Sequence, residues 1–235
     1  MTKNDKSLSK GVLSGLYLYP IKSCGALKIT KGSWPLSNSS LKYDRQFVIM
    51  QGKTTLTQKN EPLLCQIQTK IDLKHEIMVL SASWKTNTCE ISLRENLNYP
   101  GSSLSLCSGK VCGDIIEGYD CGEAVADWLE DTLGLTGLRL VKLHERKSKS
   151  LIKSLANEAQ FLCLNYESAK NLHSKIQNNI EQDVDWLLEQ FRGNLIFNGF
   201  PAYVEEFWQS IQIGNEIKLQ SKGPCTRCNI IRDLS

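Results

Sequence analysis

Apolar and polar residues alternate in short runs along the first half of the chain, with turn residues between the runs. Residues 12–19 (VLSGLYLY) alternate and stop at Pro20, and residues 46–50 (QFVIM) form a second apolar run. The alternation predicts a β-strand, because a period of two places alternate side chains on one face of a sheet. The second run is likewise interpreted as a strand. Further short strands are predicted at 54–58, 64–71, 76–82 and 88–93. Strands this closely spaced, without helices between them, favour an antiparallel sheet or barrel over a doubly wound α/β fold.

Helical periodicity begins only after residue 120. Five residues fall on one face of a helix that starts at Glu123, with Asp120 as its N-cap and Gly134 as its C-cap: Val125, Trp128, Leu129, Thr132 and Leu133. Later elements are predicted as helices at 168–177 and 181–190, strands ending at 164 and spanning 195–198, a short helical turn at 205–208, and a hairpin of 211–213 with 216–220. The pattern predicts an α+β fold that is mostly β, with a few packed helices.

Composition narrows the class of protein. The chain has 235 residues, 41% hydrophobic and 23% charged, which is typical of a globular protein with a packed core. A net charge of +3 is too small to indicate a nucleic-acid partner, and no apolar run is long enough to cross a bilayer. The first ten residues are polar and do not resemble a signal peptide. We therefore expect a cytoplasmic location, no nucleic-acid or membrane partner, and nine cysteines present as thiols.

Candidate chemistry is concentrated in four polar clusters at strand ends: Lys22–Ser23, Arg45, Arg192-Gly193-Asn194 and Cys225–Cys228. Two thiols three apart follow the turn formers Gly223 and Pro224, and the guanidinium of Arg227 between them favours the thiolate form. The C-x-x-C pattern is consistent with a redox pair, with half a zinc site, or with one metal-ligating thiolate. A zinc site would need Cys107 and Cys112 as its other half.

Each of the other clusters has a functional and a structural interpretation. Lys22 and Ser23 suit an anion site or a plain surface turn, and Arg45 could reach a ligand phosphate or pair with Asp44. Cations around a soft thiolate describe a site for a phosphate-bearing ligand that carries a thiophilic metal. The basic residues of 142–153 are interpreted as a solvated loop or, less simply, as a phosphate-attracting rim.

Seven runs, in this order, resemble the MOSC domain with its N-terminal β-barrel partner: LYLYPIKSCGAL, YDRQFVIM, QKNEPLLCQI, YDCGEAVADWLE, NEAQFLCLN, FRGNLIFNG and KGPCTRC. The resemblance extends from about residue 12 to the last residue. NEAQFL and GPCTRC are most similar to the branch formed by the C-terminal domain of eukaryotic molybdenum cofactor sulfurases. A second branch is the mitochondrial amidoxime-reducing component.

The resemblance implies a MOSC-type β-barrel and a division into a disordered tail (1–11), an N-terminal β-barrel domain (12–141), a basic loop (142–154) and a MOSC domain (155–235). It implies that the chain binds molybdenum cofactor, the molybdenum complex of molybdopterin. The implied pterin and phosphate contacts are Lys22, Ser23, Arg45, Asn157, Arg192, Asn194 and Arg227. Cys228 matches the cysteine that ligates molybdenum and is the implied catalytic residue, with Cys225 as an auxiliary thiol.

The implied function is to present the cofactor while a sulfido ligand replaces an oxo ligand, for use by xanthine dehydrogenase and aldehyde oxidase. Sulfur would come from a cysteine desulfurase domain with pyridoxal phosphate, which a chain of this length cannot also contain. The alternatives are a molybdenum oxidoreductase acting on N-hydroxylated substrates and a non-catalytic structural or zinc-binding domain. Two departures are expected to matter: the family continues with a strand beyond the point where this chain ends, seven residues after Cys228, and Gly193 predicts a looser turn.

Overall fold

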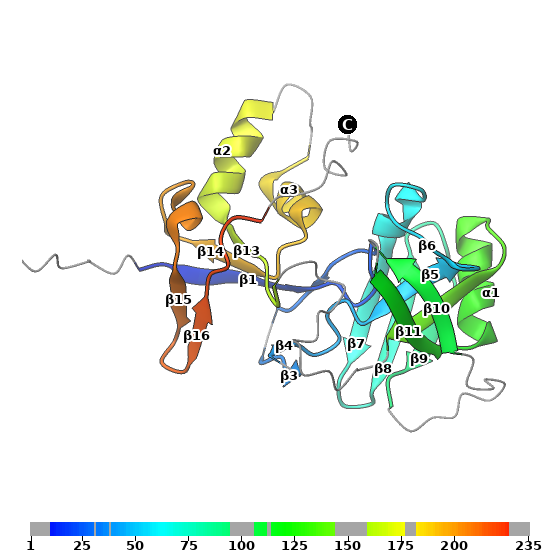
Figure 1. Ribbon diagram of the computed structural model, residues 1–235. Helices are drawn as coiled ribbons and strands as arrows, with labels where there is room; N and C mark the ends of the chain where they lie inside the picture. Colours follow the sequence, from blue (N-terminus) through cyan, green and yellow to red (C-terminus); the bar gives the residue numbers. More distant parts are fainter. Residues whose placement is uncertain are drawn as a thin grey trace, which may run out of the picture. The chain divides into compact units, whose positions relative to one another are not determined.

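The computed structural model of the chain describes residues 10–30, 32–37, 39–94, 106–111, 114–143, 159–176 and 182–225 (Figure 1). These residues are mostly β-strand, with three α-helices among them, which confirms the predicted α+β class. The chain divides into two compact units, which are described separately below. The terminal unit comprises Met1–Tyr17, Lys28–Lys31 and Phe161–Ser235, and the central unit comprises Leu18–Leu27 and Gly32–Gln160.

Two sheets and a small hairpin form the β-structure of the central unit. One sheet has the order β10-β11-β12-β5-β6, and this order closes on itself through a single parallel residue pair, Lys110 with Thr54. Its strands are β5 (Phe47–Gln51), β6 (Thr54–Thr55), β10 (Leu106–Val111), β11 (Asp114–Asp120) and β12 (Leu138–Leu143). The other sheet contains β7 (Ile67–Asp72), β8 (Ile77–Ala82) and β9 (Cys89–Ser92), and the hairpin contains β3 (Leu36–Ser37) and β4 (Ser40–Leu41).

Strand β5 forms the centre of this unit's core. Its residues 47–50 are at most 2% exposed, so both faces of the strand are buried, which explains why its sequence is a continuous apolar run. Helix α1 (Glu123–Leu133) packs against β12 and β9, and all five residues predicted on its inner face are buried. Two indole N–H groups fix the helix further, since Trp128 donates to the Asn87 carbonyl and Trp84 donates to the Thr132 carbonyl.

The two ends of α1 test the predicted caps. Gly134 adopts the left-handed conformation (φ 66°) and is the C-cap, as predicted, because a residue without Cβ enters this region at little cost. The predicted N-cap, Asp120, is wrong: the N-cap is Gly122, and no side chain caps it. Asp120 is the last residue of β11, too early for a cap, and its carboxylate instead accepts a hydrogen bond from the Gly122 N–H at 2.8 Å.

The terminal unit contains a four-stranded sheet of order β13-β14-β1-β2. These strands are β13 (Cys163–Asn165), β14 (Leu195–Asn198), β1 (Val12–Leu18) and β2 (Leu27–Lys28). Strands β13 and β14 are parallel, because α2 (Tyr166–Ile176) and α3 (Val184–Phe191) cross between them on one face of the sheet (Figure 1). The antiparallel pairing predicted for the strands of the first half of the chain thus does not extend to this pair.

The remaining elements of the terminal unit lie close to the positions predicted from the sequence. The hairpin of β15 (Ser210–Ile213) and β16 (Ile217–Gln220) turns at Gly214 as predicted, and the short helical turn is a 3-10 helix, η3 (Val204–Phe207).

Some boundaries in the central unit were not predicted. The strand expected at 64–71 begins only at β7, because the 3-10 helix η1 (Pro62–Gln66) precedes it. Glu61 accepts a hydrogen bond from the Leu63 N–H and so caps η1.

The three α-helices of the described residues contain 8 to 11 residues each. A membrane-spanning helix needs about 20, so none of these helices can cross a bilayer.

Glu130 joins α1 to β12, and its replacement should weaken the central unit. One carboxylate oxygen of Glu130 accepts hydrogen bonds from the Gly137 N–H at 2.6 Å and the Leu138 N–H at 3.0 Å. We expect Glu130→Ala to lower the free energy of unfolding in urea by about 1–2 kcal/mol, since both donors lose a charged acceptor. Asp127→Ala on the exposed face of the same helix is the control, with an expected change within about 0.5 kcal/mol. Equal effects of the two changes would contradict this role.

Candidate functional site

Two loops of the central unit bring three of the predicted site residues together. Lys22 and Ser23 follow the end of β1, and Arg45 precedes β5. The Lys22 N–H donates to the Phe47 carbonyl at 2.8 Å, and the Phe47 N–H donates to the Pro20 carbonyl at 3.0 Å. The two loops therefore lie side by side, joined by backbone hydrogen bonds.

Arg45 is held by several contacts within the central unit. Its guanidinium donates to Asp44 Oδ2 at 2.5 Å and lies over the ring of Tyr19, 4.9 Å from the centroid. The Arg45 N–H also donates to the Tyr19 carbonyl at 2.8 Å. Both charged residues are buried, with Asp44 2% and Arg45 8% exposed. The structure thus shows the pairing with Asp44 that the sequence left open as one interpretation of Arg45.

Two further contacts involve the loop of Arg45. Trp34 donates its indole N–H to the Lys42 carbonyl at 2.8 Å, and the ammonium of Lys42 lies 5.0 Å from the centroid of the Tyr43 ring. The hydrogen bond from Trp34 therefore restricts the backbone of the loop at Lys42.

Left-handed backbone conformations occur repeatedly at the predicted residues. Among the described residues other than glycine, seven have positive φ, and three of these are predicted site residues: Ser23 (70°), Arg45 (51°) and Arg192 (57°). Tyr43 (71°) is a fourth, in the same loop as Arg45. Such conformations cost free energy and persist where the surrounding contacts impose them, which is common at functional sites.

Arg192 and Asn194 lie in the terminal unit, in the turn between α3 and β14. Arg192 is the left-handed C-cap of α3, and its N–H donates to the Glu189 carbonyl. A Cβ atom on Gly193 would come within 2.5 Å of Leu164 Cδ1, so this turn requires glycine for close packing. The looser turn expected at Gly193 is therefore wrong.

The side chain of Asn194 is 1% exposed and bonded to backbone groups at both of its polar atoms. Its Oδ1 accepts from the Leu162 N–H at 3.1 Å, and its Nδ2 donates to the Tyr17 carbonyl at 3.2 Å. The Asn194 carbonyl in turn accepts from the Tyr17 N–H at 2.9 Å. Asn194 thereby links β1 to the residues that precede β13 and β14, a structural role that the sequence analysis did not anticipate.

The remaining predicted site residues, Asn157, Arg227 and Cys228, lie outside the described residues, as does Cys112 of the alternative zinc site. Cys225 is described and exposed, behind Gly223 with its positive φ of 98°. Within the described part of the chain, no three side chains of the metal-ligating types cluster in a way that could hold an ion.

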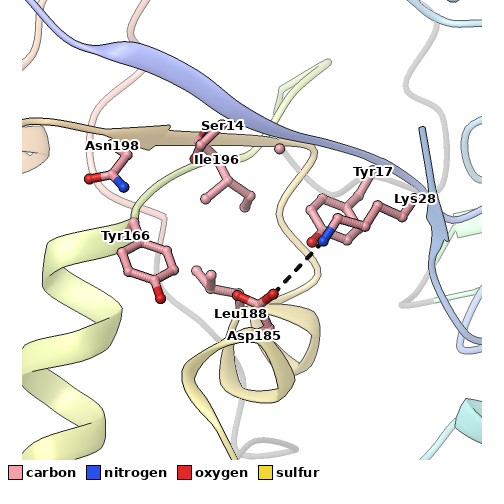
Figure 2. A pocket seen from close by; sticks show the side chains of 9 residues that line it. Ser14, Tyr17, Lys28, Tyr166, Asp185, Leu188, Ile196 and Asn198 are labelled. Atoms are coloured by element: carbon pink, nitrogen blue, oxygen red, sulfur yellow. Dashed lines mark hydrogen bonds and ion pairs between the residues drawn. The ribbon is translucent and has the colours of Figure 1, made fainter. Parts of the chain in front are cut away.

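A small cavity of about 110 Å³ lies in the terminal unit, between the sheet and its helices (Figure 2). Lys28 at its edge lies 3.8 Å from Asp185 and 5.4 Å from the centroid of the Tyr17 ring. A hydrogen bond with Tyr17 raises the pKa of Lys28, and burial raises the pKa of the neighbouring Glu189. A cationic ligand in this cavity would need the carboxylate of Asp185 and the ring of Tyr17, and Lys28 already contacts both.

Two protein-family models match this chain. The model described as the MOSC N-terminal beta barrel domain matches residues 10–136, and the model of the MOSC domain matches residues 151–233. The chain belongs to the MOSC family.

Curated relatives of this MOSC chain are molybdenum cofactor sulfurases. The protein of Bombyx mori is 37% identical over 95% of this chain, and that of Homo sapiens is 35% identical over 96% of it. Molybdenum cofactor sulfurase 2 of Culex quinquefasciatus is 37% identical over 98%. The chain spans only 27–31% of the length of these three relatives.

One solved structure, from Bordetella bronchiseptica, aligns with 57% of this MOSC chain and 96% of its own chain. The identity is 19% and the TM-score 0.40, so the likeness carries no conclusion.

We expect Asn194→Ala to destabilise the terminal unit of this MOSC chain by about 1–3 kcal/mol, because it leaves the Leu162 N–H and the Tyr17 carbonyl without their partner. Urea unfolding measures the loss. Asn171→Ala removes an exposed amide that accepts a hydrogen bond from the Tyr203 hydroxyl, and it should cost less than about 1 kcal/mol. An equal or smaller loss at Asn194 would argue against its structural role.

The thiols of the MOSC chain should differ sharply in reactivity. Burial raises the pKa of Cys163 to about 11, so at about pH 8 roughly one such side chain in a thousand is ionised. Cys225 is exposed. Alkylation followed by peptide mass spectrometry should modify Cys225 quickly and Cys163 only after unfolding. Trypsin cleaves after Arg227 and so reports Cys225 separately from Cys228. Rapid modification of Cys163 in the folded protein would contradict the expectation.

Proposed function

We propose that this chain binds molybdenum cofactor and presents it for sulfuration, as the cofactor-binding module of a molybdenum cofactor sulfurase. The observation that carries this proposal is the 35–37% identity to curated sulfurases over nearly the whole chain. The adjacent loops that carry Lys22, Ser23 and Arg45 support it independently, because their side chains suit a phosphate ester.

The donor groups of the central unit fit the anionic end of the cofactor. An ammonium, a hydroxyl and a guanidinium come from two loops joined by backbone hydrogen bonds, and two of the three residues have left-handed backbone. Lys22, Ser23 and Arg45 would bind the pterin and its phosphate. Of the three, the Arg45 guanidinium is held by Asp44 and Tyr19, and a donor that is already ordered binds a phosphate with little further loss of conformational freedom.

Further residues also belong to the proposal. Arg192, Asn157 and Arg227 would contact the pterin or its phosphate, and Asn194 would act mainly by ordering the turn that carries Arg192. Cys228 would ligate the metal through its thiolate, the ligand type that thiophilic metals prefer. Arg227 beside it would favour that thiolate.

When bound, the cofactor supplies a molybdenum centre at which sulfido replaces oxo. The task of this chain is to hold and orient that centre. Sulfur would come from a pyridoxal-phosphate-dependent cysteine desulfurase domain, and the receivers would be xanthine dehydrogenase and aldehyde oxidase. We propose a cytoplasmic location for this exchange.

The domain organisation is part of the proposal. Residues 12–141 would form the family's N-terminal barrel domain and residues 155–235 its MOSC domain. The closed strand order of the central unit supports the first assignment for the strands it contains, whereas β1 belongs to the sheet of the terminal unit.

The first test is elemental analysis of the chain purified from cells that make molybdenum cofactor, together with fluorescence of the oxidised pterin. We expect molybdenum and pterin in near-equal amounts. Cys228→Ala should lose molybdenum, whereas the matched change Cys225→Ala should retain it. Equal metal content in the two variants would contradict the ligand role of Cys228.

Other outcomes separate the alternatives. Zinc without pterin would overturn the proposal in favour of a structural zinc domain. Bound molybdenum together with reduction of an amidoxime by an added electron donor would replace sulfuration with a reductase function.

A further inference from the structure

Asp44 is the acidic partner of the candidate phosphate-binding arginine, and its carboxylate is almost fully enclosed. The side chain is 1% exposed, against 10% for that of Arg45. Taking a carboxylate out of water is costly, so such a group normally has strong partners. Asp44 has two of them, since Oδ2 accepts from the Arg45 guanidinium and Oδ1 accepts from the Tyr19 N–H at 2.9 Å.

Tyr19 completes a closed set of contacts around Arg45. Its N–H binds the Asp44 carboxylate, its carbonyl accepts from the Arg45 N–H, and its ring lies beneath the guanidinium. Tyr19 is itself 1% exposed. Both the backbone and the plane of the guanidinium are therefore fixed by neighbours that are themselves immobilised.

We propose that Asp44 and Tyr19 are positioning residues, which orient the Arg45 guanidinium so that it selects a phosphorylated pterin over its dephosphorylated form. This role rests on the proposed binding of molybdenum cofactor. Arginine recognises phosphate through a planar fork of donors, so affinity depends on the plane of the fork as well as on its charge. Loss of a group that orients a metal ligand typically weakens binding roughly 10- to 100-fold, and we expect a loss of similar size for a group that orients a phosphate-binding arginine.

The test compares two fluorescent ligands, the oxidised phosphorylated pterin obtained from molybdenum cofactor and the same pterin after phosphatase treatment. Asp44→Asn keeps an acceptor for the Tyr19 N–H and removes the charge that holds Arg45. We expect it to weaken binding of the phosphorylated pterin roughly 10- to 100-fold and to leave binding of the dephosphorylated pterin unchanged. Asp131→Asn, which removes an exposed carboxylate paired with Lys85, is the control and should change neither affinity.

A second readout follows the guanidinium without any ligand. In spectra with isotope-labelled arginine, wild-type Arg45 should give separate N–H signals, because its bond to Asp44 blocks rotation of the guanidinium. Arg45→Lys assigns these signals by their loss. They should merge in Asp44→Asn and persist in Asp131→Asn.

The outcomes are distinct. Equal loss of both pterins, or wild-type selectivity in Asp44→Asn, would overturn the positioning role. If the wild-type chain binds neither pterin, the proposed function fails, and the arginine spectra alone then decide whether Asp44 orients Arg45.

If Asp44→Asn does not fold, Tyr19→Leu provides the second variant. It removes the ring beneath the guanidinium and keeps both backbone bonds. It should lower affinity for the phosphorylated pterin alone, and unchanged selectivity would overturn the role of Tyr19.

Discussion

The end of strand β1 is the constraint on which both groups of candidate residues depend. The backbone of Tyr17 binds Asn194 through its N–H and its carbonyl, within the terminal unit. Two residues later, the backbone of Tyr19 binds Asp44 and Arg45 in the same manner, within the central unit. One stretch of chain therefore provides the backbone partners for the turn beside Arg192 and for the loop of Arg45. A shift in the register of β1 would disturb the hydrogen bonds of both.

The elements that the sequence predicted well are those dominated by burial. The run 46–50 became β5 because both of its faces are enclosed, and the inner face of α1 followed from helical spacing alone. In each case the information lies in local pattern, which a single sequence carries.

What could not be predicted depends on pairing between distant segments. The parallel alignment of β13 and β14 requires knowing that two helices cross between them on one face of a sheet. The hydrogen bonds from Asn194 to backbone groups join residues up to 177 positions apart. The tripeptide Arg192-Gly193-Asn194 contains no local pattern that predicts them. That Arg45 pairs with Asp44 and lies over Tyr19 likewise could be known only from the positions of these residues.

Trp34 gives the protein an intrinsic optical probe for the loop of Arg45. Its indole N–H is bonded to the Lys42 carbonyl within that loop, and indole emission responds to changes in the polarity around the ring. A rearrangement of the loop that breaks this bond and exposes the half-buried indole to water would shift its emission to longer wavelength. Comparison with Trp34→Phe would isolate the signal of Trp34 from that of the other tryptophans, and the signal would report the kinetics of loop movement in real time, without a label on the ligand or the protein.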